Sequence, residues 1–581
     1  MAVELSQGRF DLTHNKTLLE ETFYVLTKKN SVFRVKLTNL GLHLIKEQEN
    51  HVKTQVIPIK DIIGCRCLRS KKQSYSCACQ SLPHSSLKVV DEKSGEHDDT
   101  DISAYLYIYS YILRANRNKR ERTTITLRFR SFDKYDENYK EAQRWRTILK
   151  KLIRGEEVTN VNITDYNITH IKEDRRLLIL LNPKSGVGKG RTLFQKKIVP
   201  ILQEAEIPFD LHITKFANYA REFVRSCQLF QWTGVIVVGG DGLLFEVING
   251  IFERWDWSEA IKHISFGIIP GGSGNGLARS IAHCCGEPYS PPSLPAALAA
   301  TRSHHEMMDL VRVETTSQIM FSFLSIGWGI LSDIDIESEI LRALGEPRFT
   351  LWSLARLIGL RSYTGKVYYL PADANITPCD NKMPSFDLSN NADLPSEVHL
   401  ETNNGRQRLD SWYSAASRRS AYFSTTGSSY QSTTESDGEN LEKPRMYGPA
   451  SQLPCLTAPL PPNWKCLTGR FILVHASYQT HIGSDLFISP QGKLNDGLMW
   501  LLIIHASASR TQVLQFLLGL ATGSHANPNL WDGVIEMFTV RAFRIEPDVR
   551  ERGYLTVDGE CVEYGPIQAE IFPSLVKVMV P

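Results

Sequence analysis

The sequence reads Val235-Ile236-Val237-Val238-Gly239-Gly240-Asp241-Gly242 near its middle, an apolar run followed by a glycine-rich turn that carries one carboxylate. An apolar run rich in valine is typical of a buried parallel strand. Apolar residues then recur at helical spacing, at Leu244, Val247, Ile248 and Ile251. The glycines allow a tight turn and a close approach of a ligand to the backbone. Because ligands bind at the carboxyl ends of strands in an open α/β sheet, Asp241 is a candidate functional residue, unless the turn only connects a strand to a helix.

Two further glycine-rich turns flank this segment. A predicted strand at 177–181 runs into residues 182–190, NPKSGVGKG, and a predicted strand at 264–269 runs into residues 270–276, PGGSGNG. The first turn is not a P-loop, because Gly190 stands where that motif requires Ser or Thr. Backbone N–H groups at a helix N-terminus still suit phosphate. With another strand at 209–214 and a helix from about Asn218, the pattern predicts a parallel sheet that carries ligand-binding turns at one edge.

From about Val311 the pattern changes to strands. We expect strands at 319–326, 471–476, 498–504, 535–545 and 567–580, and helices at 349–360 and 511–520. One face of the first helix collects Leu351, Leu354, Ala355 and Ile358, and this face could line an apolar pocket, touch a bilayer or pack in an ordinary core. Residues 372–462 are polar and without periodicity, which predicts a disordered insert open to phosphorylation.

Residues 1–155 show the pattern of a small β module closed by one helix. Strands are predicted within 31–45, 105–109 and 124–129, followed by a helix that Gly155 ends. This order resembles a pleckstrin-homology (PH) module in pattern, without a specific motif. Residues 156–173 read as a polar linker. A basic cluster lies between two strands and could either meet anionic lipid headgroups or form a solvated loop: Arg114, Arg117, Lys119, Arg120 and Arg122.

The composition excludes several classes of protein. The 581 residues carry a formal charge of +3, which is too small to indicate a nucleic-acid partner. No apolar run reaches the roughly 18 residues that a membrane-spanning helix needs, and the first residues do not form a signal peptide. The 11 cysteines are scattered, and the CxC pairs Cys65/Cys67 and Cys77/Cys79 lack the CxxC spacing typical of zinc sites. We therefore expect reduced thiols, a cytoplasmic protein and no dedicated cluster of metal ligands.

Several motifs together resemble the sphingosine kinases of the diacylglycerol-kinase-like superfamily. The likeness rests on Leu181-Asn182-Pro183, Gly239-Gly240-Asp241-Gly242, Gly272-Ser273-Gly274-Asn275 and Asp558-Gly559-Glu560, and most specifically on the segment from Gly327-Trp328-Gly329 to Arg348-Phe349-Thr350. The resemblance implies an α/β plus β fold, with a Rossmann-like catalytic domain at 174–308 and an antiparallel β-sandwich lipid domain at 309–581, interrupted by the insert 372–462. ATP is expected between these domains, and the PH-like module at 1–155 lies outside the likeness.

The resemblance also implies roles for individual residues. Asp241 is expected to accept the proton of the lipid hydroxyl, and to contact the substrate together with Gly239, Gly240 and Gly242. Arg342 and Arg348 are expected to clamp phosphate through forked, charge-assisted hydrogen bonds. Mg²⁺ is expected with ATP because the phosphoryl charge must be neutralised. Further nucleotide contacts are expected at Asn182, Pro183, Lys184, Thr214, Lys215, Phe216, Ala217, Asn218, Glu246, Gly272, Ser273, Gly274, Asp558, Gly559 and Glu560.

Asp335 bears on the choice of lipid. Sphingosine has a free ammonium beside its reactive hydroxyl, whereas ceramide has an amide there and diacylglycerol an ester. A desolvated carboxylate is a natural partner for the ammonium and is left unpaired by the other two lipids. Phe349 begins the segment expected to line the alkyl-chain pocket, where burial contributes roughly 0.8 kcal/mol per methylene.

The expected activity is transfer of the γ-phosphate of ATP to the primary hydroxyl of sphingosine. A ceramide kinase is an alternative, since that family shares the Gly-Gly turn and a PH-like N-terminus, but Asp335 and Ser273-Gly274-Asn275 argue against it. A membrane-binding scaffold with an inactive kinase core is a second alternative, although it would need neither Asp241 nor Arg348. The expected partners are sphingoid bases and, through peripheral recruitment, an anionic membrane surface, with no nucleic acid. A homodimer is left open.

Overall fold

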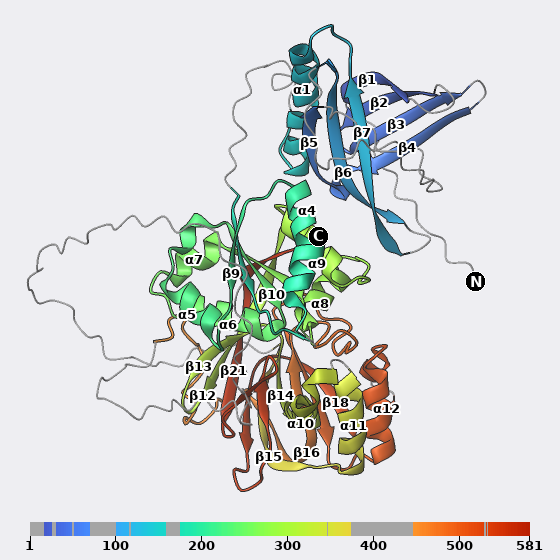
Figure 1. The fold of residues 1–581 in the computed structure, drawn as a ribbon. Coiled ribbons are helices and arrows are strands. Elements are labelled where there is room, and N and C mark those ends of the chain that lie inside the picture. The colour runs from blue at the N-terminus through green and yellow to red at the C-terminus, as the bar shows by residue number, and fades with distance from the viewer. Residues whose placement is uncertain are drawn as a thin grey trace, which may run out of the picture.

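The computed structural model describes residues 17–25, 31–48, 51–69, 100–114, 118–158, 175–373 and 445–581, apart from residues 187, 273, 345–346, 528–529 and 532. Figure 1 shows an N-terminal β module, a central α/β region and a large β region that follow one another in space. The fold is therefore mixed α/β with a large sheet, as the sequence predicts. Residues 374–444 of the predicted insert, most of the predicted linker and the Cys77/Cys79 pair lie outside the described residues.

The N-terminal module contains two antiparallel sheets and one helix. Strands β1–β4 form a four-stranded sheet and β5–β7 a three-stranded sheet. Ala142, Trp145 and Leu149 on one face of α1 are buried against both sheets, as the helical spacing predicts. Gly155, at φ +75°, follows the end of that helix. The elements are β1 Thr17–Val25, β2 Ser31–Thr38, β3 Gly41–Gln48, β4 His51–Pro58, β5 Ile62–Arg69, β6 Ala104–Arg114, β7 Lys119–Phe129 and α1 Tyr135–Ile153.

The central region is a parallel sheet in the order β9-β8-β10-β11, with helices packed on it. Residues Val235 to Val238 of β10 are fully buried, which explains their continuous apolar sequence. All four predicted strands are confirmed. The elements are β8 Leu177–Leu181, α3 Gly190–Leu193, α4 Val199–Glu204, β9 Phe209–Ile213, α5 Tyr219–Ser226, β10 Gly234–Gly239, α6 Asp241–Phe252, α7 Trp257–His263, β11 Ser265–Pro270, α8 Gly276–Cys284 and α9 Ser293–Thr301.

The third region is built mainly from antiparallel strands, with three helices near one end. Its predicted helices, and most of its predicted strands, are confirmed within a few residues. The predicted domain boundary at 308/309 falls inside a strand, β12. The elements are β12 His305–Thr315, β13 Ile319–Ser322, β14 Ser325–Gly329, α10 Ile330–Glu337, α11 Pro347–Ile358, β15 Tyr363–Pro371, β16 Lys465–Ser477, β17 Met499–His505, α12 Arg510–Gly519, β18 Ile535–Pro547, β19 Leu555–Val557, β20 Glu560–Val562 and β21 Ile567–Met579.

One predicted strand, at 319–326, is interrupted. The structure has two strands there, β13 and β14, separated by Phe323 and Leu324. The backbone N–H groups of Phe323, Leu324 and Ser325 donate to the carboxylate of Asp558 at 2.9–3.0 Å, so they are not available to a neighbouring strand. The apolar periodicity of the sequence does not reveal this, because the bonding partner lies more than two hundred residues away in the chain.

Strand β21 joins the central and third regions into one continuous sheet. It pairs in parallel with β11, at Ser265 and Phe266, and antiparallel with β12 and β18. The two regions therefore share backbone hydrogen bonds as well as apolar contacts. This continuity fixes the carboxyl-terminal edge of the parallel sheet relative to the antiparallel region.

The N-terminal module packs on the central region through apolar and ionic contacts. Tyr105, Tyr107, Tyr109 and Tyr111 line one face of β6 and are buried with apolar residues of β8 and α9. Arg120 donates to Glu287 of the central region at 2.6 Å and to Asp61 at 2.8 Å, and its side chain is 4% exposed. Figure 1 shows the module seated against α4 and α9.

The same contacts explain the basic cluster of the sequence. Arg122 pairs with Glu204, and Arg114 pairs with Glu121. Arg120 is buried in the domain contact, and Arg117 lies outside the described residues. The cluster is therefore largely occupied by carboxylates, and neither a lipid-facing patch nor a solvated loop describes it fully.

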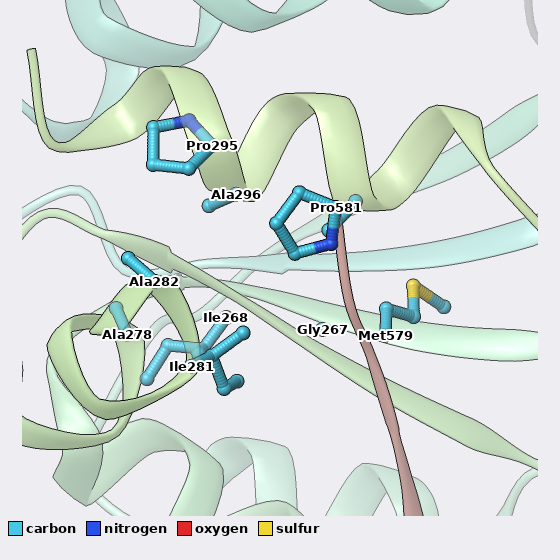
Figure 2. Close-up of a pocket in the computed structure, with 10 residues that line it drawn as sticks. Gly267, Ile268, Ala278, Ile281, Ala282, Pro295, Ala296, Met579 and Pro581 are labelled. Atoms are coloured by element: carbon cyan, nitrogen blue, oxygen red, sulfur yellow. The ribbon is translucent and has the colours of Figure 1, made fainter. Parts of the chain in front are cut away.

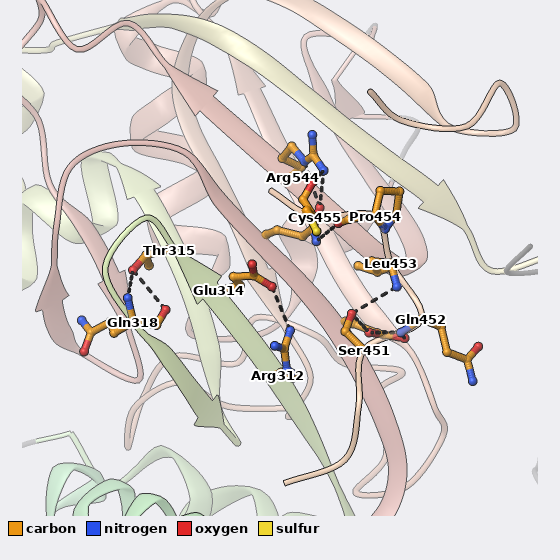
Figure 3. A network of polar contacts seen from close by, with 12 residues as sticks. Arg312, Glu314, Thr315, Gln318, Ser451, Gln452, Leu453, Pro454, Cys455 and Arg544 are labelled. Carbon is orange, nitrogen blue, oxygen red and sulfur yellow. Dashed lines mark hydrogen bonds and ion pairs between the residues drawn. The ribbon is translucent and has the colours of Figure 1, made fainter. Parts of the chain in front are cut away.

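Residues 445–462, expected to be disordered, are instead packed against the third region, so that part of the prediction is wrong. The Tyr447 N–H donates to the Phe252 carbonyl of α6 at 2.8 Å. Figure 3 shows the segment held on β18 and β21, where Arg544 donates to the carbonyls of Ala458 and Cys455 at 2.8 and 3.0 Å. Gln568 donates to the Pro454 carbonyl at 2.9 Å. The segment needs no regular secondary structure, because buried side chains of the sheet satisfy its backbone carbonyls.

Candidate active site

The three glycine-rich turns lie against one another at the carboxyl-terminal edge of the parallel sheet. A Cβ added to Gly272 would stand 2.6 Å from the Cα of Gly240, and one added to Gly186 would stand 2.7 Å from the Gly271 carbonyl oxygen. Real Cβ contacts are not this short, so the turns after β8, β10 and β11 approach each other only because these positions lack side chains. The edge therefore presents bare backbone, as phosphate binding requires.

Asp241 is the first residue of α6 and is 8% exposed. Its Oδ2 accepts from the Gly276 N–H at 2.8 Å, and its Oδ1 accepts from the Leu277 N–H at 3.3 Å. The N-termini of α6 and α8 thus converge on one carboxylate, whose charge both helix dipoles stabilise. Burial nevertheless dominates and raises the pKa of Asp241 to about 6, while the backbone hydrogen bonds oppose the shift.

The turn after β9 meets α6 through Glu246. The Oε2 of Glu246 accepts from the Ala220 N–H at 3.1 Å, at the start of α5. Burial raises the pKa of Glu246. Asn218 adopts the left-handed conformation, with φ 64°, and directs the chain into α5. Thr214 is buried, whereas Lys215, Phe216 and Ala217 are exposed in the same turn.

The turn after β8 begins with an Asn that organises its own backbone. Asn182 Oδ1 accepts from the Lys184 N–H at 2.9 Å, an arrangement typical of Asx turns. A Cβ on Gly190 would stand 2.6 Å from the Asn182 carbonyl oxygen, so the helix that follows also needs a bare backbone at this point. Pro183 is half-buried and Lys184 is exposed, so the side chain of Lys184 can extend toward the phosphates of a nucleotide that enters from solvent.

Residues of the third region face this edge. A Cβ on Gly242, beside Asp241, would stand 2.6 Å from Glu560 Oε1, and one on Gly559 would stand 3.2 Å from Asp335 Oδ2. Arg348 Nη2 lies 3.8 Å from Asp335 Oδ1, and its guanidinium stacks 4.4 Å from the centre of the Phe349 ring. The fold thus brings residues predicted from widely separated motifs to one place.

Asp335 lies on α10 in an acidic environment. Burial is the largest cause that raises its pKa to about 7, with smaller contributions from Glu339, Glu560 and Asp241, while Arg348 opposes the shift. Its side chain is nevertheless 34% exposed, so the carboxylate borders the space between the two regions. A cation placed beside it would relieve the repulsion among these carboxylates.

Asp558 anchors the acidic turn to the segment that joins β13 and β14. It is 4% exposed, and its carboxylate accepts from Ser322 Oγ and from the three N–H groups between β13 and β14. These bonds hold the turn that carries Glu560 near Gly242. Of the predicted acidic turn, Glu560 is therefore the carboxylate placed toward Asp241. Ser273 and the side chain of Arg342 lie outside the described residues.

Helices α10, α11 and α12 enclose an apolar cluster beside Asp335. Ile330 and Ile334 of α10 are buried with Leu473, Leu502 and Phe516, and Phe349, Trp352 and Leu357 of α11 pack against them. Glu337 of α10 ties the two helices together by accepting from Trp352 Nε1 at 2.9 Å and from Arg356. The face of α11 that the sequence singled out points elsewhere: Leu351, Leu354 and Ile358 are 54%, 58% and 71% exposed.

One contact at the site has no signal in the sequence. Ser484 Oγ donates to the Gly274 carbonyl at 3.2 Å, which ties the turn after β11 to an irregular segment that follows β16. That segment has neither periodicity nor a recognisable motif, so only the fold identifies its position.

The described residues contain no group of three or more His, Cys, Asp or Glu residues placed to hold a metal ion. Cys65 is buried in the N-terminal core, where burial raises the pKa of its thiol to about 12. A small apolar depression lies between β11, α8 and α9 and is lined by residues such as Ile268, Ile281 and Pro295 (Figure 2). It offers no polar chemistry and is not part of the candidate site. Within the described chain, no helix is both long and apolar enough to cross a membrane.

Comparisons with known proteins find two family models and a solved structure that are similar to parts of this chain. The family described as the diacylglycerol kinase catalytic domain matches residues 176–313, and the family described as the YegS C-terminal NAD kinase beta sandwich-like domain matches residues 465–580. A solved diacylglycerol kinase from Bacillus anthracis str. Sterne covers 70% of this chain and 97% of its own, at 16% identity and a TM-score of 0.41.

Two relatives match at higher identity. Sphingosine kinase 2 of Homo sapiens is 33% identical over 97% of this chain and 91% of its own length. Sphingosine kinase 1 of Mus musculus is 33% identical over 69% of this chain and 89% of its own length. Since the first of these similarities spans nearly all of both chains, the protein belongs to the sphingosine kinase family, within the lipid kinase superfamily.

Proposed function

We propose that this protein transfers the γ-phosphate of ATP to the primary hydroxyl of sphingosine and related sphingoid bases. Membership of the sphingosine kinase family supports the kinase activity and the class of lipid. The observation that carries the proposal is the convergence of Asp241, Asp335 and Glu560, from the parallel sheet, α10 and the acidic turn, around the bare backbone of the glycine turns.

Asp241 acts as the base of this reaction. In a loose transition state for phosphoryl transfer, the base mainly orients the hydroxyl and accepts its proton late. The N–H groups of Gly276 and Leu277 hold the carboxylate at the helix N-termini, so its position does not depend on a flexible side chain. A pKa of about 6 keeps Asp241 ionised at neutral pH while it remains basic enough to take a proton.

The glycine turns and the turn after β9 form the nucleotide site of this proposal. Asn182, Thr214, Glu246 and Gly272 border it, and backbone N–H groups bind the phosphates. Mg²⁺ is held in proteins by one or two carboxylates together with substrate phosphates, so a prebuilt cluster of ligands is not required. Glu560, beside Gly242, is placed to contribute such a carboxylate, and Mg²⁺ would supply charge neutralisation at the phosphates.

The carboxylate of Asp335 binds the ammonium of the sphingoid base. It borders the space between the regions, and its neighbours Glu339, Glu560 and Asp241 make that place favourable for a cation. The alkyl chain enters the apolar cluster among α10, α11 and α12, next to Phe349. An amide or an ester in place of the ammonium leaves the carboxylate without this partner.

Two outer helices support recruitment to a membrane surface. Leu351, Leu354 and Ile358 of α11 and Leu514 and Leu518 of α12 are all exposed. Exposed apolar side chains on adjoining helices are typical of surfaces that meet a lipid interface. Such a surface beside the lipid pocket gives a substrate dissolved in the bilayer a short route to Asp335.

The arrangement of domains is also part of this proposal. We take the central parallel sheet as a Rossmann-like nucleotide domain, the antiparallel strands as a sandwich-like lipid domain, and the first module as PH-like. The order β9-β8-β10-β11 supports the first assignment, and the four- and three-stranded sheets closed by α1 support the last.

The test is phosphate transfer from labelled ATP with Mg²⁺ to sphingosine, ceramide and diacylglycerol in matched micelles. We expect transfer to sphingosine alone, and a loss of at least 10²-fold in kcat for Asp241→Asn with folding intact. In Asp335→Asn, KM for sphingosine is expected to rise at least tenfold, since a charge-assisted bond is lost. Glu259→Gln, which neutralises an exposed carboxylate of α7 ahead of β11, is the control. Preferential transfer to ceramide would contradict the role of Asp335.

A further inference from the structure

One buried side-chain amide joins the central region to the third region. Asn249 of α6 is fully buried. Its Oδ1 accepts from the Phe321 N–H of β13 at 2.9 Å, and its Nδ2 donates to the Phe321 carbonyl, also at 2.9 Å. The amide therefore pairs with both backbone groups of one residue, as a neighbouring strand would. Among the strands that the structure describes, β13 pairs with β12 alone, so Asn249 covers its other edge.

Within the central region, α6 has a fixed position against α5. A Cβ on Gly250 would stand 2.5 Å from the Arg221 carbonyl oxygen, so the two helices touch through bare backbone. Arg221 Nε also donates to Glu253 at 2.8 Å, and the side chain of Glu253 is 1% exposed. Asn249 thus extends from a helix that is already tied to the nucleotide side of the candidate site, since α5 follows the turn after β9.

The face of α6 that carries Asn249 also carries Gly242. The two residues are seven apart, which is close to two turns of an α-helix, so they lie on one side of α6 and about 10 Å apart along its axis. Gly242 is the position whose added Cβ would stand 2.6 Å from Glu560. Phe252 stacks on the ring of Phe321, with 3.9 Å between the ring centres. This face of α6 therefore contacts the third region along the length of the helix, beside β13 (Figure 1).

On the side of the third region, the bonds continue from Phe321 to the acidic turn. The next residue, Ser322, donates from Oγ to Asp558 at 2.5 Å. Asp558 is followed by Gly559 and Glu560, the carboxylate placed toward Asp241. A short series of hydrogen bonds therefore leads from the amide on α6 to the acidic turn. A shift of β13 along α6 would move that turn relative to the first residue of the helix.

Strand pairing alone does not set this register next to the site. In the described chain, β11 pairs with β21 at Ser265 and Phe266, the first two residues of β11, whereas the glycine turn follows its last residue, Pro270. The ring stack between α6 and β13 contributes apolar burial, which is not directional. Two hydrogen bonds to one residue are directional and have one optimal geometry. In the contact between α6 and β13, Asn249 therefore supplies the register.

We propose that Asn249 is a positioning residue for phosphoryl transfer, whose amide sets the register of α6 against β13 and thereby the place of Glu560 relative to Asp241. This inference rests on the proposed function, because Asn249 acts through those two carboxylates. The expected sensitivity is high, since a displacement of about 1 Å among reacting groups can lower a rate about 100-fold.

The experiment measures kcat and both KM values for Asn249→Leu and Asn249→Ser, with ATP, Mg²⁺ and sphingosine. Leu is close to Asn in size but cannot pair with Phe321, whereas Ser leaves room for a water molecule that satisfies the Phe321 backbone and so preserves folding. In both variants kcat is expected to fall at least about tenfold. KM for ATP and for sphingosine should stay within about threefold of wild type, since each binding surface remains on its own region.

Phe252→Leu is the matched control, because it removes the ring stack between the same two elements and leaves both hydrogen bonds of Asn249 in place. It is expected to lower the midpoint of urea unfolding, as the Asn249 variants do, while kcat stays within about twofold of wild type. Hydrogen exchange in residues 319–324 should become faster in both Asn249 variants than in wild type, because the Phe321 N–H loses its partner.

The outcomes separate a positioning role from a structural one. Wild-type kcat in the folded Asn249 variants, or an equal loss of kcat in Phe252→Leu, would reduce Asn249 to a contribution to stability and refute the inference. Unchanged hydrogen exchange in both variants would refute it as well, and so would a rise in KM for ATP at unchanged kcat, which would assign Asn249 to nucleotide binding through Glu246. Absence of transfer to sphingosine by the wild type would instead overturn the proposed function.

Discussion

At the scale of single residues, Asp241 combines two properties that rarely occur together. It sits at the N-terminus of α6 and accepts backbone N–H groups of α8, which favours its charged form. It is also almost fully buried, which disfavours the charge, and the second effect is larger. The balance gives Asp241 the strength of an intermediate base. The hydrogen bonds to its carboxylate among the described residues come from backbone N–H groups, not from a histidine.

The pH dependence of the reaction follows from this pKa. Because the folded-state pKa of Asp241 is raised to about 6, the residue is protonated below that pH and cannot accept the hydroxyl proton. We expect kcat, measured at saturating sphingosine so that the bound ammonium keeps Asp335 ionised, to fall about tenfold per pH unit below 6 and to level off above it. A profile measured between pH 5 and 8 tests this.

Asp335→Asn provides the control for that profile, because the pKa of Asp335 is itself raised to about 7. Burial is the largest cause of the raised pKa of Asp241, and backbone hydrogen bonds oppose it. The break near pH 6 should therefore persist in Asp335→Asn. A flat profile between pH 5 and 7 in both proteins would exclude Asp241 as the base.

The positions of candidate residues could be predicted from the sequence where a short motif carries them. Asp241, Glu246 and Glu560 lie in short segments with strong local signals, and the fold brings them to one edge. The role of Asp558 could not be read in this way, since its partners are backbone N–H groups of a distant turn. Likewise, no pattern around Ser484 indicates its position, because that position depends on a contact with the remote turn after β11.

At the scale of elements, the three glycine turns act as one unit. Each turn follows a parallel strand, and the backbones approach so closely that a single methyl group has no space between Gly272 and Gly240. The bare backbone of this edge, where we propose that phosphate binds, therefore depends on the strand order and on the missing side chains of all three turns.

A methyl group placed between these turns should separate them. In Gly272→Ala, the new Cβ would stand 2.6 Å from the Gly240 Cα, so the backbone must shift. We expect a loss of about 1–3 kcal/mol in the free energy of unfolding and a rise of at least tenfold in KM for ATP. Urea unfolding and steady-state kinetics measure the two effects.

Gly469→Ala on β16 is the matched control, because nothing lies within 4 Å of its added Cβ. It should leave KM unchanged and increase stability by a few tenths of a kcal/mol, through the unfolded chain. Equal kinetics for Gly272→Ala and wild type would mean that ATP does not use this edge.

Most helices and strands could be predicted from the sequence. Which face of a helix is buried, and where a strand is interrupted, could not. The α11 pattern predicts a helix, and its apolar stripe is real, but the stripe is exposed while Trp352 and Leu357 pack inward. Since both faces of α11 carry apolar residues, periodicity cannot decide which is buried. The packed segment 445–462 has no periodicity at all, because side chains of β18 and β21 fix it from outside.

At the scale of the whole molecule, the N-terminal module is part of the kinase rather than an appended domain. Its tyrosine face is buried against β8 and α9, and Arg120 links Asp61 to Glu287 across the contact. The module therefore has a fixed position on the face of the central sheet.

Removal of the buried guanidinium should loosen this contact. Arg120→Met leaves the carboxylates of Asp61 and Glu287 buried without their cation, which we expect to lower the free energy of unfolding by about 3–5 kcal/mol. Chemical unfolding measures the loss, and limited proteolysis shows whether the module separates. Arg114→Met removes an exposed pair with Glu121 and should cost at most about 1 kcal/mol. Equal losses in the two variants would show that the contact does not depend on Arg120.

The central place of β21 has a consequence for synthesis on the ribosome. This strand, residues 567–579, lies between β11 and the antiparallel strands, yet it is translated after every other element described. Until it emerges from the exit tunnel, β11, β12 and β18 each present an unpaired edge, and such edges attract other chains. The nascent kinase therefore has to wait for its last strand, so chaperones that shield strand edges should associate with it until translation of this strand is complete.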